Sequence, residues 1–274
     1  MQGWGFKIKI GATIGKKDFT FGGTDEERLA DLQQMLDDDK INAVMCARGG
    51  YGLVRIIDRV NFKKFIQHPK WVIGFSDATV LHSHINKNYG IATLHSKMCN
   101  SFIDPAVGEP IQNETIDSIR RCLVGGKMRY TAIPNANNRP GSARGLLIGG
   151  NLKTLETLSG TTSDINTRNK ILFIEDTGEY LYSIDRMLWN LKRTGKLEAL
   201  AGLIIGGFKI KPDDEGEAFG KTLEQMVLEK VFVYHYPVCF DFPVGHQKNN
   251  FALKCGVMHE LHIDNTSADL KDIS

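Results

Sequence analysis

Residues 71–85 read WVIGFSDATVLHSHI, an apolar run followed by a short turn and a helix start at Asp77. A sharp strand–turn–helix junction pushes the serine at its centre, here Ser76, out of the sheet as a nucleophile. The residues two before and two after such a serine must be small, because the chain doubles back there. Gly74 and Ala78 meet this need, although glycine at both places is the usual pattern. The stretch therefore predicts a nucleophilic serine at a strand end.

Strands alternate with helices along the first half of the chain. Apolar patterns predict strands at residues 5–11, 41–46 and 71–75, and helices beginning near residues 25, 53 and 77. Thr24 with Glu27 three residues on is typical of a capping box. This alternation predicts a parallel α/β sheet that binds ligands at the carboxyl ends of its strands, where Ser76 and the Arg48-Gly49-Gly50 turn both fall.

A break in the pattern follows. Residues 131–143, TAIPNANNRPGSA, are rich in proline and asparagine and have little to bury, which predicts an interdomain linker. Beyond it, residues 170–176, 202–208 and 256–263 are typical of strands and residues 182–192 of an amphipathic helix. We therefore expect two domains, residues 1–130 and 144–274.

Three residues in this arrangement suit hydrolytic chemistry. Ser76 lies on the predicted turn, Glu175 ends the strand ILFIE, and His246 lies in the irregular loop PVGHQ. A serine, a histidine that takes its proton and a carboxylate that orients the histidine form a hydrolytic triad. The backbone N–H groups of Asp77 and of the glycines at 49 and 50 could form an oxyanion hole.

Each feature also has a simpler interpretation. Ser76 could cap a helix, Glu175 could be a surface acid in a turn, and His246 could be structural. The glycines of residues 49–52 could form a tight turn or a phosphate loop, although they lack the spacing of known nucleotide-binding motifs. The histidine pairs at 82 and 84 and at 259 and 262 are spaced onto different faces of their elements, so no metal site is expected.

The composition excludes several classes of protein. The 274 residues are 42% hydrophobic and 24% charged with a net charge of +2, which is ordinary for a globular chain and gives no reason to expect nucleic-acid or membrane binding. No apolar run approaches the ~18 residues of a membrane helix, and the N-terminus lacks the apolar core of a signal peptide. Five scattered cysteines without a CxxC pair predict a reduced, cytoplasmic protein.

Long stretches of the chain resemble the LD-carboxypeptidase family of serine peptidases. The resemblance rests on GTDEERLADLQQMLDDDKINAVMCARGGYGLVRIID, GFSDATVLH, GLLIGGNL, ILFIEDTGEYLYSIDRMLWNL, GLIIGGF and FPVGHQKNNFAL, which follow one another in the family's order. It implies an N-terminal parallel-sheet α/β domain and a C-terminal β-rich, barrel-like domain, with the active site between them. It also implies a cytoplasmic homodimer with no metal or organic cofactor.

Position by position, the resemblance assigns roles to residues of this sequence. Ser76 matches the nucleophile, His246 the base and Glu175 the acid that orients it, and the Gly50 and Asp77 N–H groups match the oxyanion hole. The implied substrate is a murein tetrapeptide of cell-wall recycling, cut at the L,D bond before its terminal D-alanine. Its carboxylate needs a cation, for which Arg48 is a candidate, although Arg48 could equally pair with a nearby acid.

One departure leaves two alternatives open. Family members usually carry a strand and a helix before the segment matching WGF, and this unit is absent from the sequence, which raises the possibility of a truncated relative that only binds muropeptides. A second alternative keeps the triad but acts on peptide–nucleotide substrates, as a microcin-immunity-type peptidase or amidase. Such a site needs an aromatic platform, for which Trp189 and Tyr180 are candidates.

Overall fold

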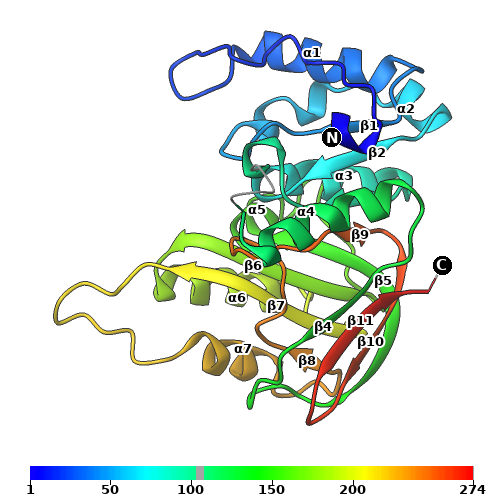
Figure 1. Ribbon diagram of the computed structural model, residues 1–274. Coiled ribbons are helices and arrows are strands. Elements are labelled where there is room, and N and C mark those ends of the chain that lie inside the picture. Colours follow the sequence, from blue (N-terminus) through cyan, green and yellow to red (C-terminus); the bar gives the residue numbers. More distant parts are fainter. Residues whose placement is uncertain (103–107, 274) are drawn as a thin grey trace.

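The computed structural model describes residues 1–102 and 108–273, and its strands form two sheets. The first sheet has four strands in the order β1-β2-β3-β9, and the second has seven in the order β4-β11-β10-β5-β6-β7-β8. In Figure 1 the first sheet and helices α1 to α3 lie above the second sheet. The chain thus has the mixed α/β fold with a second, strand-rich sheet that its sequence predicts.

The first half contains short strands separated by helices. Strands β1, β2 and β3 pair in parallel. The elements are η1 (Gln2–Trp4), α1 (Asp25–Asp37), β1 (Ala43–Met45), η2 (Leu53–Arg55), η3 (Ile57–Arg59), α2 (Lys63–Gln67), β2 (Trp71–Gly74), η4 (Ser76–Ala78), α3 (Thr79–Tyr89), β3 (Thr93–His95), η5 (Cys99–Ser101) and α4 (Pro110–Leu123).

Helix α1 begins where the capping box was predicted. The Thr24 hydroxyl accepts the Glu27 N–H at 3.2 Å, and the Glu27 carboxylate accepts the Thr24 N–H at 2.9 Å. Two of the free N–H groups at the helix start are thereby satisfied, which stabilises this end of α1. The helix buries the apolar side chains of Met35 and Leu36.

One expectation for the first half is wrong, and a second holds only in part. Residues 5–11 form no strand, because their alternating side chains are largely exposed and no neighbouring strand pairs with them. Residues 53–60 are helical as expected, but they form two short 3₁₀ helices, η2 and η3, in place of one continuous helix. A strand needs a hydrogen-bonded partner, and an apolar alternation by itself does not supply one.

The second half builds the larger sheet. Its elements are β4 (Arg129–Ala132), β5 (Gly141–Asn151), α5 (Leu152–Thr157), β6 (Ile171–Glu179), α6 (Leu181–Arg193), β7 (Gly202–Ile210), α7 (Leu223–Val231), β8 (Val238–Cys239), β9 (Leu253–Cys255), β10 (Met258–Ile263) and β11 (Ala268–Asp272). Strands β5 to β8 are parallel, whereas β4, β11, β10 and β5 pair antiparallel. Only the middle of the predicted linker is irregular, because residues 131–143 include the end of β4 and the start of β5.

The larger sheet curls over itself. An isolated antiparallel bridge joins Arg139, just before β5, to Val238 in the far edge strand β8. A Cβ placed on Gly202 of β7 would lie 3.1 Å from the Leu261 side chain of β10. This curvature agrees with the predicted barrel-like character. Helices α5, α6 and α7 cover β6 and β7 with a second apolar layer.

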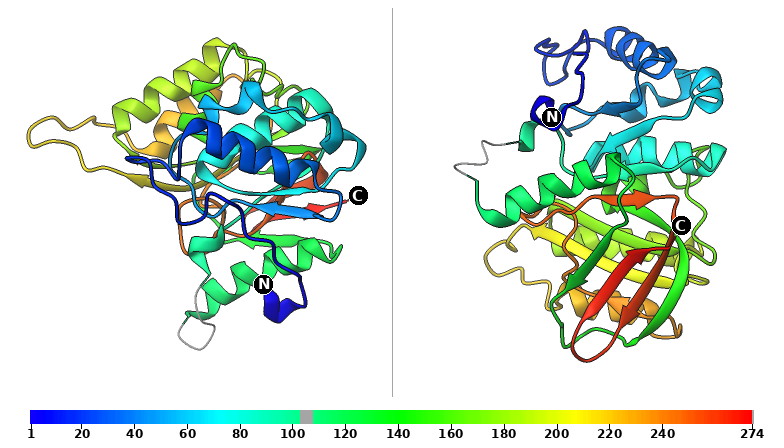
Figure 2. Two further views of the ribbon diagram at one scale, coloured as in Figure 1. Left: turned by 90° about the horizontal axis from the view of Figure 1, so that it is seen from above. Right: turned by 45° about the vertical axis from the view of Figure 1, so that its right-hand side comes forward.

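One apolar core joins the two sheets. It contains Ile73 and Leu94 from the first sheet together with Phe173 and Ile204 from the second. Strand β9, although late in the chain, pairs antiparallel with β3 in the first sheet. The two halves are therefore packed as one body. Figure 2 shows that the segment between β7 and α7, residues 211–222, projects from it.

The structure also describes the state of the cysteines and the character of the helices. All five cysteines are free. No helix among the described residues combines the length and apolar character needed to cross a membrane.

Candidate active site

The turn after β2 has the geometry predicted for a nucleophile. Ser76 has a φ of 63°, a conformation that is costly for a residue with a side chain. A Cβ on Gly74 would lie 2.8 Å from the Cβ of Ala78, so the chain does double back between two small residues. Neither η4 nor α3 is capped by a side-chain hydrogen bond, and no described residue bonds the Ser76 hydroxyl. The capping interpretation of Ser76 is therefore wrong.

The glycine turn after β1 lies directly beside this serine. A Cβ on Gly49 would lie 3.0 Å from the Ser76 Cβ and 3.2 Å from its Oγ. Gly50 has a φ of 129°, which a residue with a side chain rarely adopts. No hydrogen bond among the described residues uses the Gly50 N–H. The turn therefore brings an unpaired backbone donor near Ser76.

Glu175 and His246 meet on the second half. Glu175, on β6, is fully buried, and its Oε2 lies 2.5 Å from His246 Nδ1. This hydrogen bond orients the imidazole and leaves Nε2 free to exchange a proton. The burial of Glu175 contradicts its interpretation as a surface acid.

The loop that carries His246 is fitted closely against Glu175. Gly245 has a φ of 102°, and a Cβ there would lie 2.5 Å from the Glu175 Cβ. The Gly245 N–H donates to Asn250 Oδ1 at 2.9 Å, which fixes the turn. Glycine is thus required at 245, because only its small size lets the loop approach the carboxylate.

Several contacts place the serine turn next to this pair. The rings of Phe75 and His246 have centroids 4.9 Å apart, so the residue before Ser76 packs on the histidine. Asn151 lies opposite Glu175 in the β5–β6 ladder, and its N–H donates to Thr79 Oγ1 at the start of α3, at 3.0 Å. No hydrogen bond joins Ser76 to His246 among the described residues, which is common for such groups without substrate.

A cavity of about 330 Å³ opens at Ser76 between the two halves. Gly50, Tyr51 and Asp77 line it from the first half, and Asn151, Lys153 and Asp176 from the second. His246 lines a neighbouring cavity of about 500 Å³. Ser76 therefore lines one cavity and His246 lines the other.

Both the chain's sequence and its fold match known proteins. Models of the LD-carboxypeptidase N-terminal and C-terminal domains match residues 1–96 and 144–261. A probable murein peptide carboxypeptidase of Bacillus subtilis is 36% identical over 254 residues, which span 92% of this chain and 78% of the relative. The chain belongs to the LD-carboxypeptidase family. It is a hydrolase of the LD-carboxypeptidase type.

Two further members of the family show how far the likeness extends. A murein tetrapeptide carboxypeptidase of Pseudomonas aeruginosa is 28% identical, over 92% of this chain and 82% of its own. The crystal structure of a muramoyltetrapeptide carboxypeptidase from Oxalobacter formigenes superposes with a TM-score of 0.84, covering 95% of this chain and 88% of that one at 24% identity. The superposition shows that this chain has the two-sheet fold of the family.

The cation predicted for the substrate carboxylate is not in the cavity. Arg48 is exposed, its Nε donates to the Gly49 carbonyl at 3.2 Å, and it is absent from the residues that line the Ser76 cavity. The cation that does line this cavity is Lys153, for which no ion pair is found among the described residues. The sequence signal that could have indicated Lys153 is the helix start at Asn151, whose side chain accepts the Thr154 N–H and caps α5 at the cavity wall.

Asp176 is a second residue that the sequence patterns did not single out. It is buried, and its carboxylate accepts hydrogen bonds from Asn151 Nδ2 and the N–H groups of Lys153 and Thr177. Burial raises the pKa of Asp176 to about 6 against these three donors. Glu175 and Asp176 adjoin an irregularity in the β6–β7 ladder. Asp176 lines the cavity at Ser76, whereas Glu175 is buried against His246.

Two of the other histidines lie in the core. His82 and His95 are buried in the core, and His82 Nε2 bonds the Gly74 carbonyl at 2.9 Å. Among residues 1–102 and 108–273, no group of three His, Cys, Asp or Glu side chains is placed to hold a metal ion.

Proposed function

We propose that this LD-carboxypeptidase hydrolyses the bond between the L-centre of a diamino acid and the terminal D-alanine of murein tetrapeptides, in cytoplasmic cell-wall recycling. The observation that carries this proposal is the Glu175–His246 hydrogen bond beside a serine held at a φ of 63°. The named activities of the Bacillus and Pseudomonas relatives support the substrate class.

The reaction proceeds through an acyl-enzyme. Ser76 Oγ attacks the carbonyl carbon and gives its proton to His246 Nε2, while Glu175 stabilises the charged imidazole. The N–H groups of Gly50 and Asp77 bind the oxyanion. Collapse of the tetrahedral intermediate breaks the C–N bond, and His246 returns the proton to the amine of D-alanine.

Water completes the cycle by a second attack. His246 takes a proton from the water as it adds to the ester carbonyl, and then returns that proton to Ser76 Oγ as the acid leaves. Lys153, on the cavity wall, is the residue best placed to balance the carboxylate of the substrate.

The decisive measurement is D-alanine release from a purified muropeptide tetrapeptide by the parent chain and by Ser76→Ala. We expect the substitution to lower kcat by at least about a thousand-fold, because losing the nucleophile disables the whole triad. Ser83→Ala is the matched control, since Ser83 is buried on α3 and its hydroxyl has no hydrogen-bond partner among the described residues. Full activity in Ser76→Ala would contradict the mechanism.

The two alternatives give different results in the same assay. A folded parent that releases no D-alanine but hydrolyses an aminoacyl-nucleotide amide is a peptidase of the immunity type. A folded parent that binds muropeptide but is never labelled by a serine-directed phosphonate is a non-catalytic relative.

A further inference from the structure

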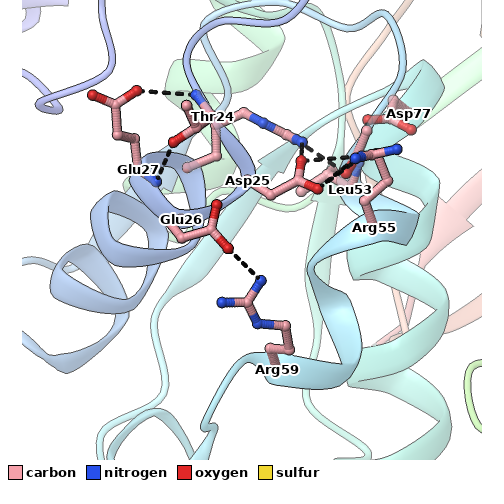
Figure 3. Close-up of polar contacts among 10 residues, drawn as sticks. Thr24, Asp25, Glu26, Glu27, Leu53, Arg55, Arg59 and Asp77 are labelled. Carbon is pink, nitrogen blue, oxygen red and sulfur yellow. Dashed lines mark hydrogen bonds and ion pairs between the residues drawn. The ribbon is translucent and has the colours of Figure 1, made fainter.

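The side chain of Asp77 reaches away from the serine turn to the glycine turn. Its Oδ2 accepts the Leu53 N–H at 2.9 Å, as Figure 3 shows. Burial raises the pKa of Asp77, while the N–H groups of Leu53 and Gly52 and the charge of Arg28 oppose this effect. A single side chain thereby ties the residue after the nucleophile to the segment that carries Gly50.

Arg28, on α1, holds the same segment from the other side. Its Nη1 donates to the Gly52 carbonyl at 3.0 Å. Gly52 has a φ of 138°, and a Cβ there would lie 2.6 Å from Arg28 Nη1, so the guanidinium occupies the space that a side chain would need. The Gly52–Leu53 segment is therefore held between an acid and a cation.

The guanidinium of Arg28 is itself immobilised. Its side chain is only 15% exposed and forms an ion pair with Asp25, which also binds Arg55 Nε at 2.9 and 3.0 Å. The ring of Phe21 contacts both arginines, with its centroid 5.1 Å from the Arg28 guanidinium carbon and 5.3 Å from that of Arg55. Arg28 and Asp77 together form a brace on the Gly52–Leu53 segment. The Arg28–Asp25–Arg55 bridge with Phe21 anchors this brace to the start of α1.

We propose that Asp77 and Arg28 are positioning residues that hold the glycine turn against the serine turn, so that the Gly50 and Asp77 N–H groups converge on one oxygen. The proposal rests on the proposed function, because it concerns the oxyanion site of that reaction. Two donors on separate loops stabilise the transition state only when the distance between the loops is fixed. Asp77 fixes it from the serine side, and Arg28 fixes it from α1.

The position of the loops matters more for the transition state than for substrate binding. A carbonyl oxygen of the substrate forms weaker hydrogen bonds than the oxyanion that replaces it. Loss of the brace should therefore lower kcat and weaken binding of a tetrahedral analogue, with little change in KM. A purely structural role would lower stability without this selective loss.

The test compares Asp77→Ala with Asp77→Asn in the D-alanine release assay. We expect Asp77→Ala to lower kcat about ten- to a hundred-fold and to weaken binding of a phosphonate analogue by a similar factor, with KM within about two-fold of the parent value. Asp77→Asn keeps an oxygen that can accept the Leu53 N–H and should recover most of the rate. Parental kcat in folded Asp77→Ala, or a change in KM alone, would overturn the proposal.

Arg28 provides the second variant if Asp77→Ala does not fold. Arg28→Met should lower kcat about ten-fold at constant KM, whereas Arg59→Met is the matched control. Arg59 forms only an exposed ion pair with Glu26, at 3.2 Å, so its removal should leave kcat unchanged (Figure 3). Equal kcat values for Arg28→Met and Arg59→Met would refute the positioning role of Arg28.

The outcome is separable from that of the proposed function. Activity retained in Ser76→Ala would remove the serine mechanism itself. Loss of activity in Ser76→Ala, together with parental kcat in Asp77→Ala and Arg28→Met, would leave that mechanism intact and refute only the positioning role.

Discussion

The backbone conformation of Ser76 is energetically unfavourable, but it presents the hydroxyl in the position that a nucleophile needs. A positive φ on a non-glycine residue costs about 1–3 kcal/mol, and it persists only where the surrounding structure imposes it. Strand β2 on one side and α3 on the other impose it here, since Ile73 and Val80, which flank the turn, are both buried. The turn that carries the Ser76 hydroxyl is thus maintained by packing on both of its sides.

Residues that stay neutral in the core should make stability depend on pH. Burial lowers the pKa of His82 from 6.5 to about 4, and it lowers the pKa of His95 as well. The unfolded chain then binds more protons than the folded chain between these pH values. The stability contributed by a neutral His82 is present above pH 6.5 and is lost as the pH falls toward 4.

We predict that the free energy of unfolding falls by about 2 kcal/mol between pH 7.5 and pH 5 through His82 alone. Urea denaturation at both pH values measures this change in the free energy of unfolding. His82→Gln keeps an N–H for the Gly74 carbonyl but does not titrate, so its loss should be smaller by that amount. The exposed His68→Gln is the control and should follow the parent. Equal losses in parent and His82→Gln would exclude this origin.

At the scale of elements, the end of β5 sets the position of α3. Gly150 has a φ of 143°, and a Cβ there would overlap the Thr79 hydroxyl, which accepts the Asn151 N–H. Gly150 also pairs with Ile174, the residue before Glu175, in the β5–β6 ladder. This close approach of strand and helix is what keeps the serine turn near Glu175.

Gly150→Ala should separate these elements. We expect more than about 2 kcal/mol of destabilisation from strain and overlap, together with a fall in D-alanine release as α3 moves from β6. Gly160→Ala is matched, because Gly160 also has a positive φ, 78°, but has open space around it, and it should cost only about 1 kcal/mol. Urea denaturation and the release assay test both variants, and equal behaviour would show that the approach at Gly150 is unimportant.

At the scale of the whole molecule, the two sheets should unfold together. Strand β9 crosses from the second half to pair with β3, and one apolar core contains residues of both sheets. Neither half buries its apolar surface without the other, which favours a single cooperative transition.

Two single-tryptophan variants test this cooperativity. One keeps Trp71 on β2 and the other keeps Trp189 on α6, and their fluorescence should report the same urea midpoint. Leu253→Ala in β9 should lower both midpoints together, because deleting a buried leucine costs about 2–5 kcal/mol. Two separate transitions, or a shift in only one of them, would show that the halves unfold independently.

Local features were predictable from the sequence because they depend on near neighbours. The turn at Ser76 needs small residues two positions away on either side, and the start of α1 needs an acceptor and a glutamate three residues apart. The strands β2 and β6 and the helix α6 follow from apolar periodicity in the same way. The family resemblance added the pairing of Glu175 with His246.

Contacts between distant segments could not be predicted in this way. Residues 5–11 have the pattern of a strand but no partner, and β9 has a partner that lies some 160 residues earlier in the chain. Arg48 lies next to the glycines in sequence, yet Lys153 lines the cavity.

The sequence by itself determined the serine turn, the helix caps and the set of groups available for catalysis, since short-range backbone geometry dictates these. Only the tertiary structure decided how closely Glu175 approaches His246, that Asp77 and Arg28 both bind the Gly52–Leu53 segment, and that Lys153 lines the same cavity as Ser76. The reason is that such contacts depend on how the two sheets pack around a shared core, and packing is a property of the whole chain.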